Sequence, residues 1–431
     1  MHLRMILALA IAVPGVAALA QPQPPLSAPA QDPRRLTLQQ ALRLAEDAEP
    51  TLRRKRAELL AAEGARAEAS ALLFNNPQAS VETTRRQVPQ SGLPTERRRE
   101  WGAGLSQTLE IAGQQGHRRR AAQSVLEAGQ AEVADVRRRV LTDTAVQFYR
   151  LVYQQRRLRI DEQAVALLDT ASSAVQKRKA AGEDTRLDAN VAAVEAERAR
   201  NQAAVTREQL ADLQADLAAK LQLPPPAIIV AEEPSERAPL RVSQDELSGA
   251  AANAPRLRAV ATREEAAAAR LKLEQASTYP DVTVGVQVGR EGAPDARERL
   301  TTFSVSIPLP LFKRNDAGIG QARSELEQAR IEHQSAMNEQ RSQVYSLWTK
   351  LQSLSARVER LRTTVLPALQ NNEALSAKSQ KAGQISVLDL MVVNRQSLDA
   401  RRDLLEAELD YQLTRLALEA AIGQPIGGIA P

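Results

Sequence analysis

The side chains that could carry chemistry are few in this chain of 431 residues. It has no cysteine and three histidines, His2, His117 and His333. We expect the last two to be solvated or to lie between helices, because no carboxylate motif surrounds them in sequence. Met337 and Met391 are isolated, which disfavours a series of soft-metal ligands. The residue types therefore predict that the protein is not an enzyme and has no catalytic site, cofactor or metal site.

A second group of polar residues occurs twice, in segments 181–188 (AGEDTRLD) and 382–389 (AGQISVLD), about 201 residues apart. Each segment follows a helical pattern that ends in lysines. A glycine after a cationic last turn ends a helix, and Ser, Thr or Asp shortly after it begins another. We therefore predict two tight turns between antiparallel helices, and the doubling indicates a duplicated unit. The turn residues are Gly182, Glu183, Asp184, Gly383 and Gln384.

Helical periodicity defines the elements that must position these turns. In the first repeat, residues 37–226, a helix over 37–74 is interrupted at Pro50, and a long helix over 113–180 and a helix over 185–222 follow. The second repeat, residues 242–425, has the same order, with a long helix over 317–382 and a helix over 387–422. Each long helix would extend about 100 Å at 1.5 Å per residue.

Between the first and second helix of each repeat the hydrophobic period changes to two. Ala79, Val81 and Thr83 alternate with polar residues, and Val282, Val284, Val286 and Val288 do the same in the second repeat. We predict β-hairpins over 78–110 and 281–310, with polar loops over 88–100 and 289–300. Strands of about ten residues match the length of a tilted membrane strand.

Four strands cannot close a barrel, and open strand edges are not viable in lipid. The smallest membrane barrels have about eight strands, so we expect the chain to share its barrel with copies of itself.

The ends of the chain indicate export. Residues 1–20 have the basic start, apolar core and small-residue cleavage site of a signal peptide. Residues 21–36 form a proline-rich tail that we expect to be extended. Residues 227–241 form a connector between the repeats, and residues 426–431 form a C-terminal tail.

The net charge of the chain is only +5, and arginine alternates with glutamate along the helices. This pattern is typical of solvated helix faces, so no nucleic-acid partner is expected.

With these features the chain resembles the TolC family of outer-membrane efflux proteins from Leu36 to Pro425. The resemblance depends on the duplicated plan and on two short motifs, residues 105–113 (LSQTLEIAG) and residues 307–318 (IPLPLFKRNDAG). The second motif is most similar to the cation-efflux (CzcC-like) branch. Two features depart from the family: no cysteine follows the signal peptide, and residues 112–118 (AGQQGHR) replace the usual Gly-Gly-Lys-Arg.

The resemblance implies a mainly α fold with a small β part. Duplicated coiled-coil hairpins would form a periplasmic α-barrel, and four strands per chain would contribute to a trimeric twelve-stranded membrane β-barrel. The homotrimer would lie in the outer membrane of a Gram-negative bacterium, in contact with its lipid, and extend into the periplasm. It would be the exit duct of a tripartite efflux pump, bound to a periplasmic adaptor protein and an inner-membrane RND-type transporter.

The resemblance also suggests a role for the aspartates after the two turns. The tunnels of the family are narrowed by acidic side chains at this end, and Asp389 and Asp188 match that position. In a trimer, repulsion among three Asp389 carboxylates would raise their pKa values and favour a bound cation. The alternative is that both acids stabilise the start of a helix through its dipole.

Other functions were weighed against this one. A periplasmic coiled-coil adaptor protein would have one hairpin between small β-domains, whereas this chain has two symmetric copies. A soluble coiled coil is disfavoured by the signal peptide and the period-two strands. Within the channel interpretation, the cargo can be heavy-metal cations, drugs or a protein secreted by a type I system.

Overall fold

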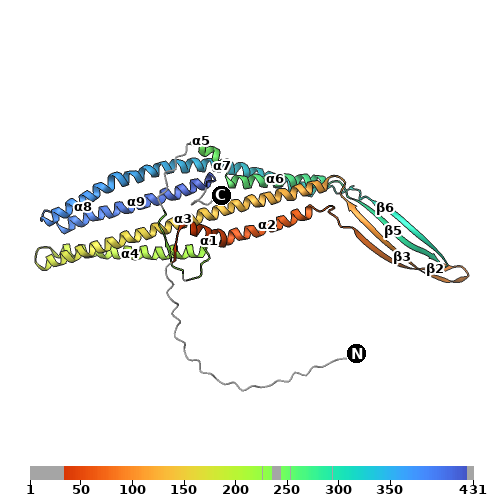
Figure 1. The fold of residues 1–431 in the computed structure, drawn as a ribbon, viewed down its shortest axis with the longest axis horizontal. Coiled ribbons are helices and arrows are strands. Elements are labelled where there is room, and N and C mark those ends of the chain that lie inside the picture. The colour runs from red at the N-terminus through yellow and green to blue at the C-terminus, as the bar shows by residue number, and fades with distance from the viewer. Residues whose placement is uncertain (1–33, 226, 235–243, 253, 294, 425–431) are drawn as a thin grey trace, which may run out of the picture.

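The computed structural model describes residues 34–424, apart from 226, 235–243, 253 and 294. The molecule is elongated, with helices along most of its length and a sheet at one end (Figure 1). The predicted signal peptide, most of the proline-rich tail and the C-terminal tail lie outside the described residues.

The first repeat begins with short elements and ends with long helices. Its elements are β1 (Arg34–Leu36), α1 (Leu38–Ala48), α2 (Pro50–Ala69), β2 (Gln78–Gln90), β3 (Leu93–Leu109), α3 (Gln114–Ala180) and α4 (Arg186–Lys220). Glu49 starts α2 by accepting hydrogen bonds from the backbone of Thr51 and Leu52, and Pro50 occupies the first helical position, where a missing N–H costs nothing. The predicted helix over 37–74 ends earlier than expected, at Ala69.

The second repeat has the same order. Its elements are β4 (Ile229–Ala231), α5 (Gln244–Ala251), α6 (Pro255–Ala276), β5 (Val282–Ala293), β6 (Ala296–Ser306), α7 (Asp316–Arg360), a π-helical turn (Leu361–Val365), α8 (Leu366–Lys381) and α9 (Val387–Ala421). The helices α4 and α9 each contain 35 residues. The duplication is therefore maintained in helix length as well as in sequence.

The long helix predicted over 317–382 is present as one helical run from Asp316 to Lys381, but it is not regular throughout. It contains a π-helical turn at Leu361–Val365, two residues before Pro367. Proline lacks an N–H and its ring clashes with the carbonyl four residues earlier, so a regular α-helix cannot pass through this position unchanged. The α3 helix, which has no proline, runs for 67 residues without a break.

The short helices pack end to end along the long ones. α1, α2 and α4 contain 11, 20 and 35 residues, nearly the length of the 67-residue α3 against which they lie. The largest buried cluster joins α1, α3 and α4, and its fully buried members include Phe148 of α3 and Leu416 of α9. This cluster holds the two repeats together near the middle of the molecule.

A two-stranded parallel sheet covers this central cluster, and it corrects two predictions. β1 lies in the predicted extended tail and β4 in the predicted connector, yet Arg34 pairs with Ile229 and Leu36 with Ala231. Leu36 and Ile229 are buried. Two short segments nearly 200 residues apart were paired by tertiary packing, and neither contains enough alternation to predict a strand.

The main sheet has the order β2-β3-β5-β6, with antiparallel neighbours. Its register aligns Ala79, Leu105, Val286 and Phe303 in one row across the four strands. Most of the exposed apolar side chains of the strands share this face: Val81, Trp101, Leu105, Val284, Val286, Val288, Phe303 and Val305. The opposite face carries mainly polar residues and glycine, with Leu300 as an exception, so one face of the sheet is mainly apolar and has no cover within the described residues.

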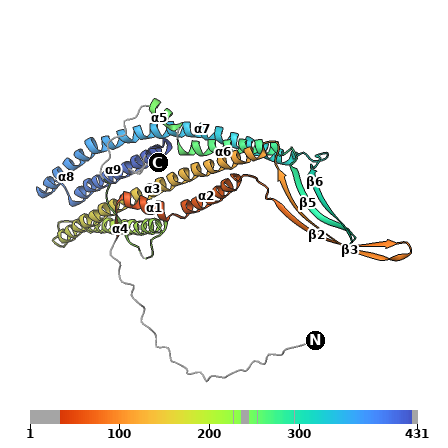
Figure 2. The ribbon, with the colours of Figure 1, turned by 45° about the vertical axis from the view of Figure 1, so that its right-hand side comes forward.

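The strands extend well into the segments predicted as hairpin loops. The loops predicted over 88–100 and 289–300 are mostly paired strand, with turns near Gly92 and Asp295. β2 and β3 project past β5 and β6 (Figure 2). Backbone pairing does not require alternating apolar side chains, which explains why these arginine-rich strands were missed.

Within the described residues, none of the helices is both long enough and apolar enough to cross a membrane.

Candidate functional site

Both predicted turns lie together at the end of the molecule farthest from the sheet (Figure 1). Gly182 has φ +81° and Gly383 has φ +72°. At the first turn the Glu183 N–H donates to the carbonyl of Arg178 over 2.9 Å, and at the second the Gln384 N–H donates to the carbonyl of Ser379 over 2.9 Å. These are Schellman motifs, in which a left-handed residue ends a helix and satisfies its last carbonyls.

The two aspartates after the turns close equivalent capping boxes. The Asp188 carboxylate accepts from the Thr185 N–H at 3.0 Å, and the Thr185 hydroxyl oxygen lies 3.1 Å from the Asp188 N–H. Asp389 and Ser386 repeat this arrangement at 3.0 and 3.1 Å. Each aspartate therefore helps to start the helix that follows it.

The same hydrogen bonds decide the protonation of the aspartates in the single chain. The hydroxyl and then the backbone N–H of Ser386 stabilise the Asp389 carboxylate and lower its pKa, and Thr185 lowers the pKa of Asp188 in the same way. This is opposite to the raised pKa predicted from repulsion in a trimer. In the chain itself, the capping hydrogen bonds hold both groups ionised.

The remaining acids of the first turn interact with one arginine. Arg178 Nε lies 3.1 Å from an Asp184 carboxylate oxygen and 3.7 Å from Glu183. Glu183 is exposed, whereas Asp184 is half-buried. The second turn has Gln384 and Ile385 at the corresponding positions, so the two turns differ in charge although they share a backbone shape.

The two hairpins pack against each other close to these turns. Val175 of α3 and Ala189 of α4 form a buried cluster with Val387 and Met391 of α9. The α8 helix contributes no buried residue of its own. The second hairpin is therefore attached to the first through α9, and α8 lies along an edge.

A buried charge reinforces this attachment farther along the hairpins. The Asp161 side chain of α3 is fully buried and accepts from Arg402 Nη2 of α9 at 2.6 Å. The Thr206 hydroxyl of α4 donates to its other oxygen at 2.7 Å. The sequence analysis missed this cluster because its members are far apart in the chain. Arginine and aspartate within helical patterns are the only signal available, and they recur throughout this sequence.

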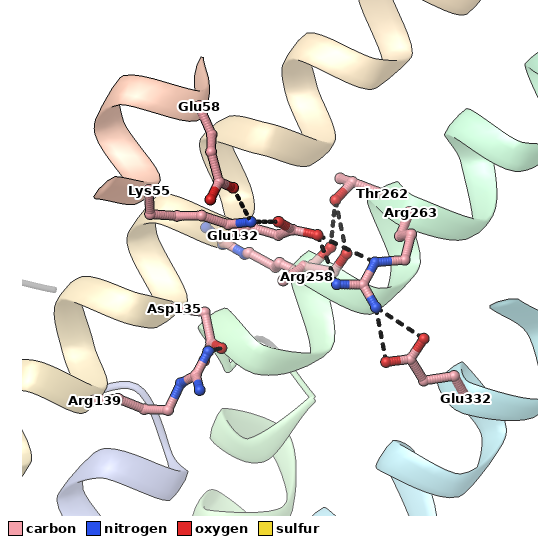
Figure 3. Close-up of polar contacts among 10 residues, drawn as sticks. Lys55, Glu58, Glu132, Asp135, Arg139, Arg258, Thr262, Arg263 and Glu332 are labelled. Atoms are coloured by element: carbon pink, nitrogen blue, oxygen red, sulfur yellow. Dashed lines mark hydrogen bonds and ion pairs between the residues drawn. The ribbon is translucent and has the colours of Figure 1, made fainter. Parts of the chain in front are cut away.

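A second cluster, which we call the ion-pair network, links the four helices that continue into the sheet. Glu132 of α3 lies between Lys55 of α2 and Arg263 of α6, at 2.7 and 2.6 Å, and Arg263 also contacts Glu332 of α7 at 2.8 Å (Figure 3). Burial opposes ionisation of Glu132, but hydrogen bonds from Lys55 and Arg263 outweigh it and lower its pKa. The network therefore connects both repeats at one level of the helical layer.

The histidines differ in their surroundings. His333 of α7 lies between helices, and its Nδ1 is 2.8 Å from a carboxylate oxygen of Glu264 on α6. This agrees with the prediction that it lies between helices, and its carboxylate partner is 69 residues away, so no local motif indicates the contact. His117 lies in the first turns of α3 beside Arg120. Among the described side chains, no group of three or more His, Asp or Glu is arranged to hold a metal ion.

Comparison with known proteins agrees with this architecture. The model of the family described as "Outer membrane efflux protein" matches residues 247–424. The chain is 25% identical over 376 residues to the cobalt-zinc-cadmium resistance protein CzcC of Cupriavidus metallidurans, covering 87% of this chain and 85% of that protein.

Solved structures extend the similarity to both repeats. The outer membrane protein VceC of Vibrio cholerae superposes with a TM-score of 0.74 at 20% identity, covering 90% of this chain and 96% of that one. The channel CusC superposes with a TM-score of 0.73 at 18% identity, covering 90% and 92%. The duplicated helical hairpins joined to a four-stranded sheet are thus a fold that these proteins share.

Proposed function

We propose that this chain, which matches the family described as "Outer membrane efflux protein" over residues 247–424, is the exit channel of a tripartite efflux pump. Its relatives and structural neighbours are outer-membrane efflux proteins, in agreement with the predicted localisation in the outer membrane with a periplasmic helical extension. The proposal adds the assembly, the partners and the cargo.

One observation carries the proposal: the exposed apolar face of the sheet, together with its two unpaired edges. Val286 and Phe303 lie on this face, and β2 and β6 each have one neighbour in the chain. An apolar face without cover suits lipid, but strand edges in lipid need partners. Three copies joined from β6 to β2 would make a closed ring of twelve strands with the polar faces inside. This arrangement satisfies both requirements with no additional element.

The experiment that tests the assembly is native mass spectrometry of the purified protein in mild detergent. A trimer is expected, and its dissociation should coincide with loss of the strand signal in circular dichroism because the barrel is shared. A folded monomer that retains its full strand content would contradict the proposal.

The helical end of the trimer is then the entrance for cargo. We assign the turns at Gly182 and Gly383 to the contact with a periplasmic adaptor protein, which would join the channel to an inner-membrane transporter of the RND type. Heavy-metal cations are the proposed cargo, supported by the similarity to a cobalt-zinc-cadmium resistance protein over most of both chains. Multidrug efflux and type I protein secretion are the alternatives that a transport assay must separate.

Asp389 is the proposed constriction residue, and its role as a cap sets the design of the test. Asp389→Asn removes the charge but leaves an oxygen that can accept from Ser386, whereas Ser386→Ala removes the cap and leaves the charge. If Asp389 narrows a cation-selective pore, Asp389→Asn should reduce the preference for K⁺ over Cl⁻ in planar bilayers, more strongly at low salt. Asp188→Asn is the matched control in the other repeat. Equal selectivity in wild type and Asp389→Asn would leave Asp389 with its capping role alone.

A further inference from the structure

A cleft of about 710 Å³ lies between α2, α3 and α6, close to the sheet. Its lining includes four cationic side chains, one histidine and one carboxylate: Arg66, Arg119, Arg120, Lys272, His117 and Glu265. The positions of His117 and Lys272 show how close it is to the strands. Each lies three or four residues from the end of its helix, about 6 Å or less along the axis.

The four cationic side chains of this cleft outnumber its one carboxylate. Arg119 donates to the carbonyls of Ala69 and Ala71 at the end of α2, at 3.2 and 2.7 Å, and Arg66 donates to the amide oxygen of Gln123 at 2.7 Å. These bonds hold the guanidinium groups in place without cancelling their charge. Among the described residues, no carboxylate forms an ion pair with any of the four cationic side chains.

Neighbouring arginines on the same helices have acidic partners. Arg118, beside Arg119, pairs with Glu110, and Arg270, two residues before Lys272, pairs with Glu325 at 2.8 Å. Glu110 and Glu325 thus pair with these two arginines and not with the cations that line the cleft. The cleft keeps its excess positive charge, which is what an anion-binding site requires.

The second observation is a band of exposed apolar side chains between the cleft and the strands. One lies at each of the four helix–strand junctions: Leu72 is 88% exposed, Ile111 61%, Tyr279 63% and Phe312 96%. Leu72 directly follows Ala71, whose carbonyl accepts from Arg119. The apolar band next to the strands suits the acyl chains of a lipid, and the cationic cleft immediately beyond the band suits its phosphate.

We propose that this cleft binds the phosphodiester headgroup of an anionic phospholipid in the leaflet that adjoins the helices. Guanidinium and ammonium groups are the usual ligands of phosphate oxygens. The apolar band identifies lipid, and not free phosphate, as the source of the anion. The inference rests on the strands lying in the outer membrane, and it is independent of the proposed partners and cargo.

The test uses the full-length protein purified in detergent, with retained lipid measured by native mass spectrometry. Phosphatidylglycerol should be retained and phosphatidylcholine should not. The variant R66Q/R120Q/K272Q removes three charges but keeps Arg119, which caps α2. At about 1 kcal/mol for each cationic side chain, its affinity for phosphatidylglycerol should fall on the order of 100-fold.

The matched control, R43Q/R53Q/R150Q, removes three exposed arginines outside the cleft and should retain lipid like wild type. If the triple variant does not assemble, Lys272→Gln alone should show a loss of about fivefold. Equal retention of phosphatidylglycerol by the cleft variant and wild type would overturn the proposal. A wild-type protein that binds inorganic phosphate but retains no phosphatidylglycerol would also overturn it. Conductance measured on the same samples separates this outcome from failure of the channel function.

Discussion

Replacing Asp161 with alanine should loosen the attachment between the two helical hairpins. The carboxylate is fully buried and accepts from Arg402 Nε and Nη2 at 3.0 and 2.6 Å, and from the Thr206 hydroxyl at 2.7 Å. Removing one member of a buried ion pair typically costs about 3–5 kcal/mol. Arg402 is 21% exposed and keeps Asp399 as a partner at 3.0 Å, so the lower end of that range applies. We expect a loss of about 3 kcal/mol.

Hydrogen exchange measured by mass spectrometry on the detergent-solubilised protein is the suitable assay, because it reports local opening of α9. A loss of about 3 kcal/mol corresponds to exchange roughly 100-fold faster around Arg402, provided that this segment opens locally. Asp399→Ala is the control, since Asp399 also contacts Arg402 but is 53% exposed, and its removal should have little effect. If Asp161→Ala exchanges no faster than Asp399→Ala, the buried ion pair does not hold the hairpins together.

Two further perturbations test the ion-pair network and the turns. Lys55 and Arg263 lower the pKa of Glu132, so its stabilisation is complete above the ordinary value of 4.5 and is lost as pH falls through the lower folded value. Glu132→Gln should therefore lower the thermal unfolding midpoint at pH 7, by the equivalent of about 1–2 kcal/mol. The difference from wild type should disappear once the pH falls below the lowered folded pKa of Glu132, and a difference that persists in acid would exclude this ion pair as its cause. Gly383→Ala should destabilise the protein by about 1 kcal/mol because φ is +72°, whereas Gly64→Ala, inside α2, should stabilise it by a similar amount. Equal shifts of the unfolding midpoint in the two glycine variants would show that the turn does not need its left-handed residue.

The sequence was sufficient for the features that depend on neighbouring residues. Helix ends at Ala180 and Lys381 follow from the glycines and cationic last turns around them, and the start of α9 follows from the Ser386–Asp389 capping box. Alternating valines predicted β5, and the doubling of the pattern predicted two equivalent repeats. These signals act over a few residues, so they can be recognised in the amino-acid sequence.

The tertiary structure decided what depends on residues far apart in the chain. Pairing of β3 with β5 placed Leu105 beside Val286, which made one sheet face apolar and the other polar. Asp161 and Arg402, 241 residues apart, became partners only after α3 and α9 packed together. Hydrophobic periodicity predicts which side chains are buried, but the folded backbone determines which charged side chains come into contact. For this reason the turns were visible in the sequence, whereas the ion pairs and the cationic cleft between the helices were not.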